Sequence, residues 1–149
     1  MDAPYFEDYA VDFRLRTMGR TVTETDLVNF VALSGMYESL FVDQEHLKNQ
    51  STYAGRLVPG ALVYAIAEGL AIQSGLLRDR GLAFLGLELA VRAPTYVGDT
   101  IHVDIQLASK RETRHADRGI VVTQHAVRNQ RDEEVMSAKI TRMIRRRLR

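Results

Sequence analysis

Glu68 is the one charged residue in a largely apolar stretch that runs from Gly60 to Leu77. Burying a carboxylate is unfavourable unless it is protonated or paired with a cation, so this glutamate needs an explanation. One explanation is chemical, because a carboxylate in a perturbed environment is a common base or nucleophile. The other is structural: the glutamate is paired with Arg56 or Arg92, or lies at a contact between two subunits.

The remaining reactive side chains indicate little further chemistry. The chain has no cysteine, which excludes thiolate metal sites and cysteine nucleophiles and fits a reducing compartment. None of its histidines has a second ligand at the i, i+4 spacing of a helical metal site; they are His46, His102, His115 and His125. We therefore expect neither a metal ion nor a cofactor.

The charge balance argues against polyanionic partners. Lysine and arginine number 20 against 19 aspartate and glutamate residues in 149, a net charge of +1. The basic cluster at residues 142–149 is expected to be a solvated tail, so we predict no nucleic-acid binding. The acidic N-terminus does not resemble an export signal, and the stretch at 60–77 is too polar to span a membrane. The expectation is one cytoplasmic domain over residues 1–149, with no membrane partner.

The elements that must position these groups begin with two helices. Thr23 and Asp26 have the spacing of a helix N-terminus, and Gly35 can end that helix in a left-handed turn. Pro59 and Gly60 open a longer central helix, about Gly60–Leu77. Its bulky residues share one side, which we expect to pack on a sheet, and its small residues share the other, which would admit a subunit or a slender ligand.

The second half of the chain has the period of β-strands. Alternating or apolar runs predict strands over residues 82–91, 101–107, 120–127 and 135–144, with turns between them. A long helix followed by a run of antiparallel strands indicates an α+β domain whose sheet wraps the helix. Such a sheet has edge strands, which pairing with a second copy would cover.

Five segments in this order resemble landmarks of a known family; they are Thr21–Asp26, Leu33–Asp43, Arg56–Gly60, Phe84–Gly86 and Pro94–Asp99. The chain resembles the MaoC-like dehydratases, the (R)-specific enoyl-CoA hydratases, over nearly its whole length. The resemblance implies the hot dog fold, in which an antiparallel sheet wraps a central helix. It also implies a dimer with acyl-CoA bound at the subunit interface.

Hydration of a 2-enoyl thioester needs a donor for the thioester oxygen and a base for the attacking water. In this family the donor is the amide of the glycine that opens the central helix, which is Gly60 in this chain. The free amides of a first helical turn and the positive end of the helix dipole both stabilise developing negative charge. The resemblance thus assigns Gly60 to the catalytic site; the alternative is a plain turn glycine after Pro59.

The chain departs from the family pattern at the base. The family's loop reads Ser, variable, Asp, variable, Asn, Pro, Leu, His, and its Asp and His hold the water. Laid on Ser34 to Phe41, this pattern puts Met36 at the Asp position and Phe41 at the His position. Neither side chain can carry a proton at neutral pH, so the usual mechanism cannot run through these two positions.

Two carboxylates are candidates for the missing base. Glu38 lies two residues after the vacated Asp position on the same loop, where a plain surface glutamate is the alternative. Glu68 lies eight positions after Gly60, and in the thioesterase branches of this fold a Glu or Asp at that spacing is a base or nucleophile. Eight helical positions turn through about 80°, from which we expect both groups to face one thioester.

Substrate contacts are expected from side chains that could line a channel for the acyl group or the pantetheine arm; they are Met36, Tyr37, Phe41 and Tyr64, together with Tyr53. Packing alone would explain these residues equally well. We expect a homodimer that binds an acyl-CoA or acyl-carrier-protein thioester, with coenzyme A present only as part of the substrate.

Three interpretations of function follow. The first is an enoyl-CoA hydratase or dehydratase in which Glu38 or Glu68 replaces the usual base. The second is an acyl-CoA thioesterase in which Glu68 activates water. The third is a non-catalytic hot dog subunit that forms a hetero-oligomer with an active homologue.

Overall fold

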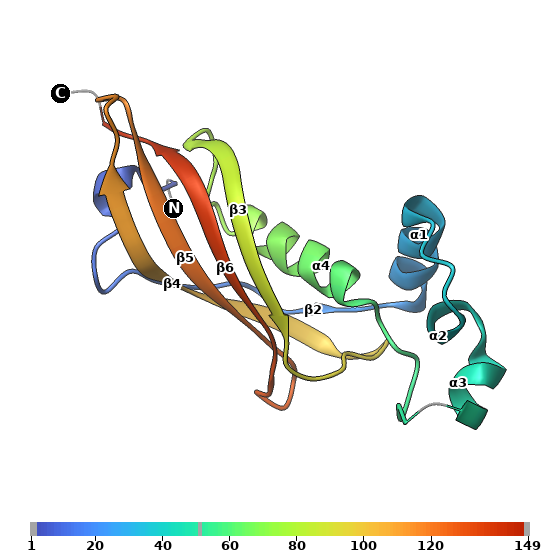
Figure 1. The fold of residues 1–149 in the computed structure, drawn as a ribbon. Helices are drawn as coiled ribbons and strands as arrows, with labels where there is room; N and C mark the ends of the chain where they lie inside the picture. Colours follow the sequence, from blue (N-terminus) through green and yellow to red (C-terminus); the bar gives the residue numbers. More distant parts are fainter. Residues whose placement is uncertain (1–2, 51, 148–149) are drawn as a thin grey trace.

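The computed structural model describes residues 3–50 and 52–147, in which one long helix lies against a strongly twisted antiparallel sheet (Figure 1). The sheet has the strand order β1-β4-β5-β6-β3, with β2 paired to β4. The strands are β1 (Arg14–Arg16), β2 (Arg20–Thr21), β3 (Gly81–Val91), β4 (Thr100–Glu112), β5 (Arg118–Arg128) and β6 (Glu134–Arg145). The α+β arrangement of one sheet around one helix is confirmed.

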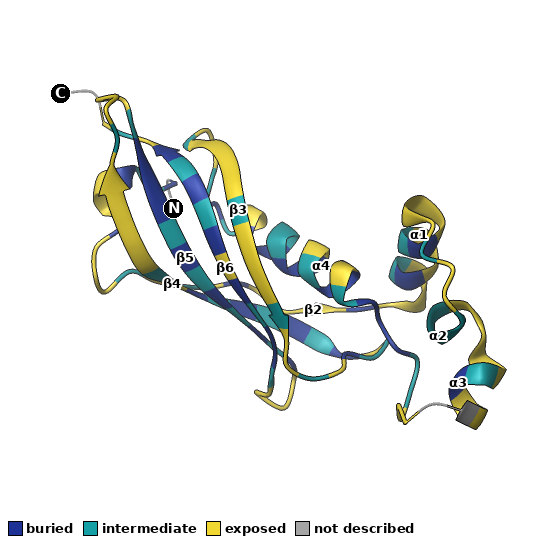
Figure 2. Cartoon of the chain, viewed as in Figure 1, coloured by how far each residue is buried: buried dark blue, intermediate teal, exposed yellow. Residues whose placement is uncertain are grey.

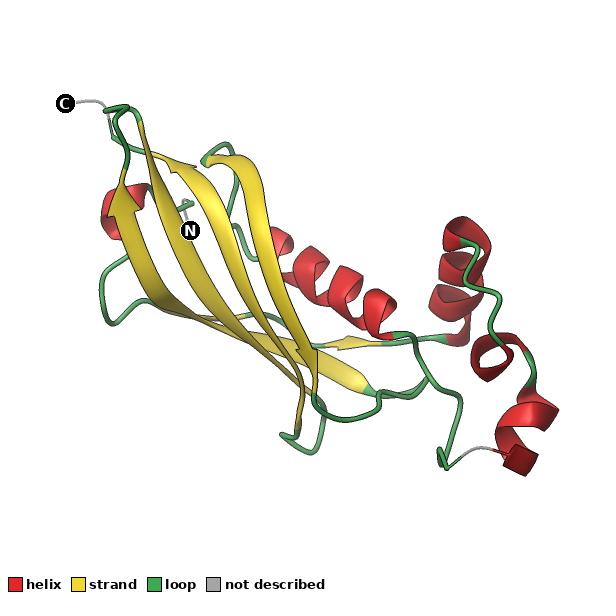
Figure 3. Cartoon of the chain, in the orientation of Figure 1, coloured by secondary structure: helices red, strands yellow, loops and turns green. Residues whose placement is uncertain are grey.

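The helices occupy the first half of the chain (Figure 3). They are the 3-10 helix η1 (Phe6–Asp8), α1 (Glu24–Ser34), α2 (Ser39–Val42), α3 (Gln44–Gln50) and the central α4 (Gly60–Gln73). In Figure 1, α1, α2 and α3 gather beyond the N-terminal end of α4, away from the body of the sheet. The sequence gives no helical signal for α2, because four residues are too few to show a period.

The first helix has the predicted ends. The Thr23 hydroxyl accepts a hydrogen bond from the Asp26 amide at 3.1 Å, and the Asp26 carboxylate accepts one from the Thr23 amide at 2.9 Å. Gly35 follows the helix at a φ of 74°, where a glycine is free of strain. The reciprocal cap fixes the start of α1, and the turn at Gly35 directs the chain toward Met36 and α2.

The central helix is shorter than predicted. It ends at Gln73 instead of Leu77, because Gly75 turns the chain at a φ of 88°. Its bulky residues Leu62, Val63, Ile66 and Leu70 are buried, as expected. The small-residue side is only partly open: Ala61 and Ala65 are exposed, whereas Ala71 is buried.

The basic C-terminal segment is not a solvated tail over the residues described. Arg142 lies on the inner face of β6 and is buried, and Arg146 and Arg147 bind the carboxylates of Glu7 and Asp8. The guanidinium groups fasten the N-terminal segment to the end of the sheet. Residues 148 and 149 lie outside the described part of the chain. Among the helices of that part, none has the length and apolarity needed to cross a membrane.

The edge strand β3 is unusually exposed for an apolar strand (Figure 2). Between 38% and 60% of the surface of its large side chains is accessible; they are Leu82, Phe84, Leu85, Leu87, Leu89 and Val91. One edge of β3 pairs with β6, and along the other the sheet ends. In contrast, β5 and β6 alternate buried and less buried residues, as strands with one covered face do.

Candidate active site

The amide of Gly60 lies at the N-terminal end of α4. Pro59 precedes the helix, and its carbonyl accepts hydrogen bonds from the amides of Leu62 and Val63 at 3.0 and 3.1 Å. Within the described chain the Gly60 amide donates to no backbone or side-chain acceptor. Because the positive end of the helix dipole lies at the same place, the amide is suited to bind a negatively polarised oxygen.

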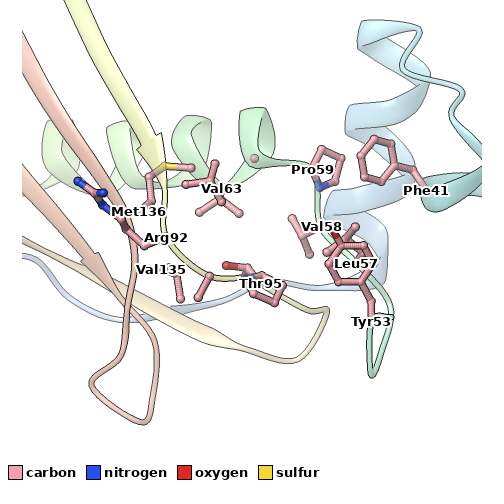
Figure 4. Close-up of a pocket in the computed structure, with 14 residues that line it drawn as sticks. Phe41, Tyr53, Leu57, Val58, Pro59, Val63, Arg92, Thr95, Val135 and Met136 are labelled. Atoms are coloured by element: carbon pink, nitrogen blue, oxygen red, sulfur yellow. The ribbon is translucent and has the colours of Figure 1, made fainter. Parts of the chain in front are cut away.

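A pocket of about 340 Å³ opens next to this amide. Its walls come from five parts of the chain: Phe41 of α2, Tyr53, residues 57–60 with Val63 of α4, residues 91–95 at the end of β3, and Val135 and Met136 of β6. Figure 4 shows Phe41 and Tyr53 on the side of the short helices, with Val63 and Met136 on the side of α4 and the sheet. Most of these side chains are apolar, so the pocket suits an acyl group.

Backbone hydrogen bonds fix one wall of the pocket. The Val58 amide donates to the Thr95 carbonyl and the Val97 amide donates to the Arg56 carbonyl, both at 2.9 Å. Leu57 and Tyr96 form an antiparallel bridge between these two bonds. The segment that leads into α4 is therefore held against the connection between β3 and β4, which places Pro59 and Gly60 at the pocket.

The described lining of the pocket includes no carboxylate and no imidazole. Its polar side chains are Tyr53, Arg92 and Thr95. Arg92 donates to the Ser137 hydroxyl at 3.2 Å, and in Figure 4 its guanidinium group lies on the opposite side from Phe41 and Tyr53. The described walls thus supply an amide suited to bind a carbonyl oxygen and mostly apolar contacts, without a carboxylate or an imidazole.

The structure brings Phe41, but not every residue expected near the substrate, into the pocket. Phe41 lines it, at the position where the family has its histidine. Met36, Tyr37 and Tyr64 are not among the lining residues, and 70% of the Tyr37 surface is accessible. Burial raises the pKa of the Tyr64 hydroxyl, and the negative charge of Glu68 adds to this effect.

Glu38 is the N-cap residue of α2 and is not among the residues that line the pocket. It is exposed, and its Oε1 accepts a hydrogen bond from the Ser39 amide at 3.1 Å. It lies three positions before Phe41, which is about one helical turn. Glu38 is thus the carboxylate candidate at the start of the short helix that carries Phe41.

Glu68 lies apart from the Gly60 pocket, with its carboxylate bound to the guanidinium group of Arg142. Eight helical residues extend about 12 Å along the helix axis. The expectation that Gly60 and Glu68 face one thioester rested on their rotation of about 80° alone and did not include this distance. The predicted pairing with Arg56 or Arg92 is wrong. Arg56 binds Glu24 instead, and the actual partner comes from β6, 74 positions away in the sequence.

The sequence did not predict that a histidine would be buried in the core. His125 on β5 is 2% exposed and shares a hydrogen bond of 2.9 Å with the Thr123 hydroxyl. Burial, with a smaller contribution from the charge of Arg142, lowers the pKa of His125 to about 3. Its place in an alternating strand was the available signal, but the sequence did not reveal which side of the strand faces the core.

No cluster of three or more metal-binding side chains of the His, Cys, Asp and Glu types occurs in the part of the chain that the structure describes. The pocket itself combines an amide donor with mostly apolar walls. Such a combination can bind and polarise an acyl carbonyl group.

Comparisons with known proteins agree with this geometry. Residues 10–129 match the MaoC like domain. The protein MaoC of Klebsiella aerogenes is 36% identical over 110 residues, which are 73% of this chain. The match covers only 31% of the length of that relative, so this chain corresponds to about a third of it.

The solved structures that share the fold include the following two. A MaoC-like dehydratase from Rhodospirillum rubrum superposes with a TM-score of 0.86 at 27% identity, covering 99% of this chain and 100% of that one. A Mycobacterium tuberculosis protein with a double hotdog fold superposes with a TM-score of 0.84 at 20% identity, covering 97% of this chain and 45% of that one. The predicted hot dog fold is confirmed, and the chain belongs to the MaoC-like domain family.

Proposed function

We propose that this chain binds an acyl thioester and carries out dehydratase-type chemistry, the addition or removal of water at a 2-enoyl thioester. The observation that carries the proposal is the free amide of Gly60 at the first turn of α4, in the wall of an apolar pocket. The family and the dehydratase among its structural relatives support it.

The Gly60 amide would bind the thioester oxygen. Water addition to the double bond builds negative charge on that oxygen, and an amide donor at a helix N-terminus stabilises such charge. A side chain at position 60 would crowd the site, since a Cβ atom there would lie 3.2 Å from Cγ2 of Val91. This is acid–base chemistry, so the proposal requires coenzyme A only as part of the substrate.

We assign proton transfer in this chain to Glu38. Met36 and Phe41 cannot carry a proton, and Glu38 lies about one helical turn from the Phe41 wall. A thioesterase that uses Glu68 has less support, because Glu68 is bound to Arg142 and lies about 12 Å along α4 from Gly60.

The proposal includes a homodimer formed through β3. An exposed apolar edge strand readily pairs with another strand, and a second copy of β3 could pair with it antiparallel. Val91 belongs both to this edge and to the lining of the Gly60 pocket. The second copy would therefore also help to close the pocket.

The test uses two substitutions at one position. Gly60→Pro removes the amide hydrogen, and proline is well tolerated at the first position of a helix. Gly60→Ala adds a Cβ atom but keeps the amide, so it controls for the crowding against Val91. With crotonyl-CoA as substrate, we expect Gly60→Pro to lose about a hundredfold more turnover than Gly60→Ala, as expected for removal of an oxyanion donor. Equal turnover by the two variants would contradict the role of the amide.

A non-catalytic subunit is the second candidate, favoured by the lack of a carboxylate or imidazole in the described pocket lining. Such a subunit would bind saturated acyl-CoA in calorimetry but would neither hydrate crotonyl-CoA nor release free thiol. Turnover of crotonyl-CoA that is abolished by Glu38→Gln would exclude it. Release of thiol would instead favour the thioesterase.

A further inference from the structure

The side chain of Arg56 connects three separate segments of the chain. Its Nη1 donates to the carbonyl oxygen of Phe41 at 2.6 Å. Its Nε donates to both carboxylate oxygens of Glu24 at 3.1 and 3.2 Å, and its Nη2 donates to Oε1 of Glu24 at 3.0 Å. Only 17% of the Arg56 side chain is accessible, against 49% of the Glu24 side chain, so the bond to the Phe41 carbonyl is the more buried of these contacts. They link the loop before α4 to both α1 and α2.

The two ends of this link differ in how firmly they are held. The backbone of Arg56 is fixed, because its carbonyl accepts the Val97 amide and the next residue bridges Tyr96. The four-residue helix α2 is much less secure. Around it the amides of Phe41, Val42 and Asp43 donate to carbonyls three or four positions back. A helix of one turn has little stability of its own, so contacts from outside must hold it in place.

The Arg56 bond reaches α2 at the residue that forms part of the pocket wall. Phe41 lines the pocket beside Gly60, and the bond to its carbonyl spans 15 positions of sequence. A displacement of α2 would move this aromatic wall and change the space left for an acyl group. Glu24 keeps the planar guanidinium group in the orientation that this bond requires.

We propose that Arg56 is a positioning residue that holds α2, and so Phe41, in place and thereby sets the length of the acyl group that the pocket accepts. The proposal rests on the proposed function, because it assumes that the pocket takes an acyl chain. Arg56 itself does not line the pocket; it acts through Phe41.

The first test does not depend on any ligand. Arg56→Lys keeps a positive charge near Glu24, but an ammonium group cannot reproduce the fork that also serves the Phe41 carbonyl. Hydrogen exchange of the amides at residues 41–43 should become faster in this variant, while exchange in β5 and β6 should not change. A matched control is Arg16→Lys on β1. Arg16 makes a similar forked pair, in which Nε and Nη2 donate to the two carboxylate oxygens of Asp104 at 2.6 and 3.0 Å. Unchanged exchange at 41–43 in Arg56→Lys would overturn the proposal.

The second test measures chain-length preference. We expect Arg56→Lys to change the ratio of octanoyl-CoA to butanoyl-CoA dissociation constants by about tenfold, the value of one charge-assisted hydrogen bond. Arg16→Lys should leave the ratio as in the wild-type chain. If the wild-type chain binds neither ligand, the proposed function fails. If it binds both and Arg56→Lys weakens them equally, only the role of Arg56 is wrong.

A double-mutant cycle separates positioning from general stability. If Arg56 acts through the ring of Phe41, its substitution should no longer change the chain-length ratio in a Phe41→Ala background. Additive effects of the two substitutions on that ratio would contradict the mechanism. Glu24→Gln should also weaken the contact that orients Arg56. We expect it to shift the chain-length ratio in the same direction as Arg56→Lys.

Discussion

At the scale of single residues, the role of Glu68 depends on which cation binds its carboxylate. The sequence left open a chemical role, a subunit contact, or pairing with Arg56 or Arg92; in the structure the partner is a different arginine, Arg142. Arg142 is 5% exposed and Glu68 is 19% exposed, so neither charge is well solvated. The ion pair joins α4 to the inner face of β6, so its role is to stabilise the fold.

The first prediction follows from this pair. Glu68→Leu leaves the buried guanidinium group of Arg142 without its counter-ion, and we expect the free energy of unfolding to fall by roughly 3 kcal/mol. Adding Arg142→Leu should restore part of the loss, because no unpaired charge then remains. Urea unfolding measures both variants. A Glu68→Leu chain that keeps its stability but loses turnover would instead identify Glu68 as a catalytic base.

His125 provides a prediction on pH. Burial holds its pKa at about 3 in the folded chain, whereas the ordinary value in an unfolded chain is 6.5. Below pH 6.5 the unfolded chain therefore binds a proton that the folded chain does not, and stability falls as the pH is lowered toward 3. The contribution of His125 to the slope of the free energy of unfolding against pH approaches about 1.4 kcal/mol per pH unit.

The comparison that isolates this effect is His125→Gln. Glutamine does not titrate and can still bond to the Thr123 hydroxyl, so the variant retains only the pH dependence of the other groups. Urea midpoints measured between pH 4 and 7 should converge for the two chains at acidic pH. Parallel curves over that range would show that folding does not lower the pKa of His125.

At the scale of elements, the four long strands β3 to β6 and the two longer helices were predictable because each is long enough to show a period. The ends depended on single residues: the Thr23 cap was visible in the sequence, whereas Gly75 shortened α4 unexpectedly. The charged residues 110–112 were expected to form a turn, yet they pair with β5, since partners across a strand decide pairing more than local polarity does. The two-residue β2 was below the length at which alternation can be recognised.

The edge strand β3 carries a prediction at this scale. If two copies of the chain pair through β3, Leu85→Lys should separate them, because a lysine on an edge opposes strand pairing. Leu85 is 50% exposed in one chain, so the substitution should leave the fold intact. Sedimentation equilibrium should give a dimer for the wild-type chain and a monomer for Leu85→Lys. Leu33→Lys on α1, at a residue 88% exposed, is the control and should remain dimeric.

At the scale of the whole molecule, the sequence was enough to predict one sheet around one helix, because the order of elements permits few other arrangements. The candidate site was only partly accessible to the same reasoning. Gly60 and Phe41 meet at the pocket, but Glu68 does not, since a helix separates residues along its axis as well as turning them. The contributions of Val135 and Met136 arise from the register of β6 with β3, which the sequence does not specify.

The most direct test of the account is a crystal structure of the chain with a non-hydrolysable acyl-CoA analogue. The account predicts that the carbonyl oxygen of the analogue lies about 2.7–3.1 Å from the amide nitrogen of Gly60, the range of an oxyanion contact. The acyl group should then lie against Phe41, Val63 and Met136. An analogue bound with its carbonyl group away from Gly60, or beside Glu68, would contradict the central claim.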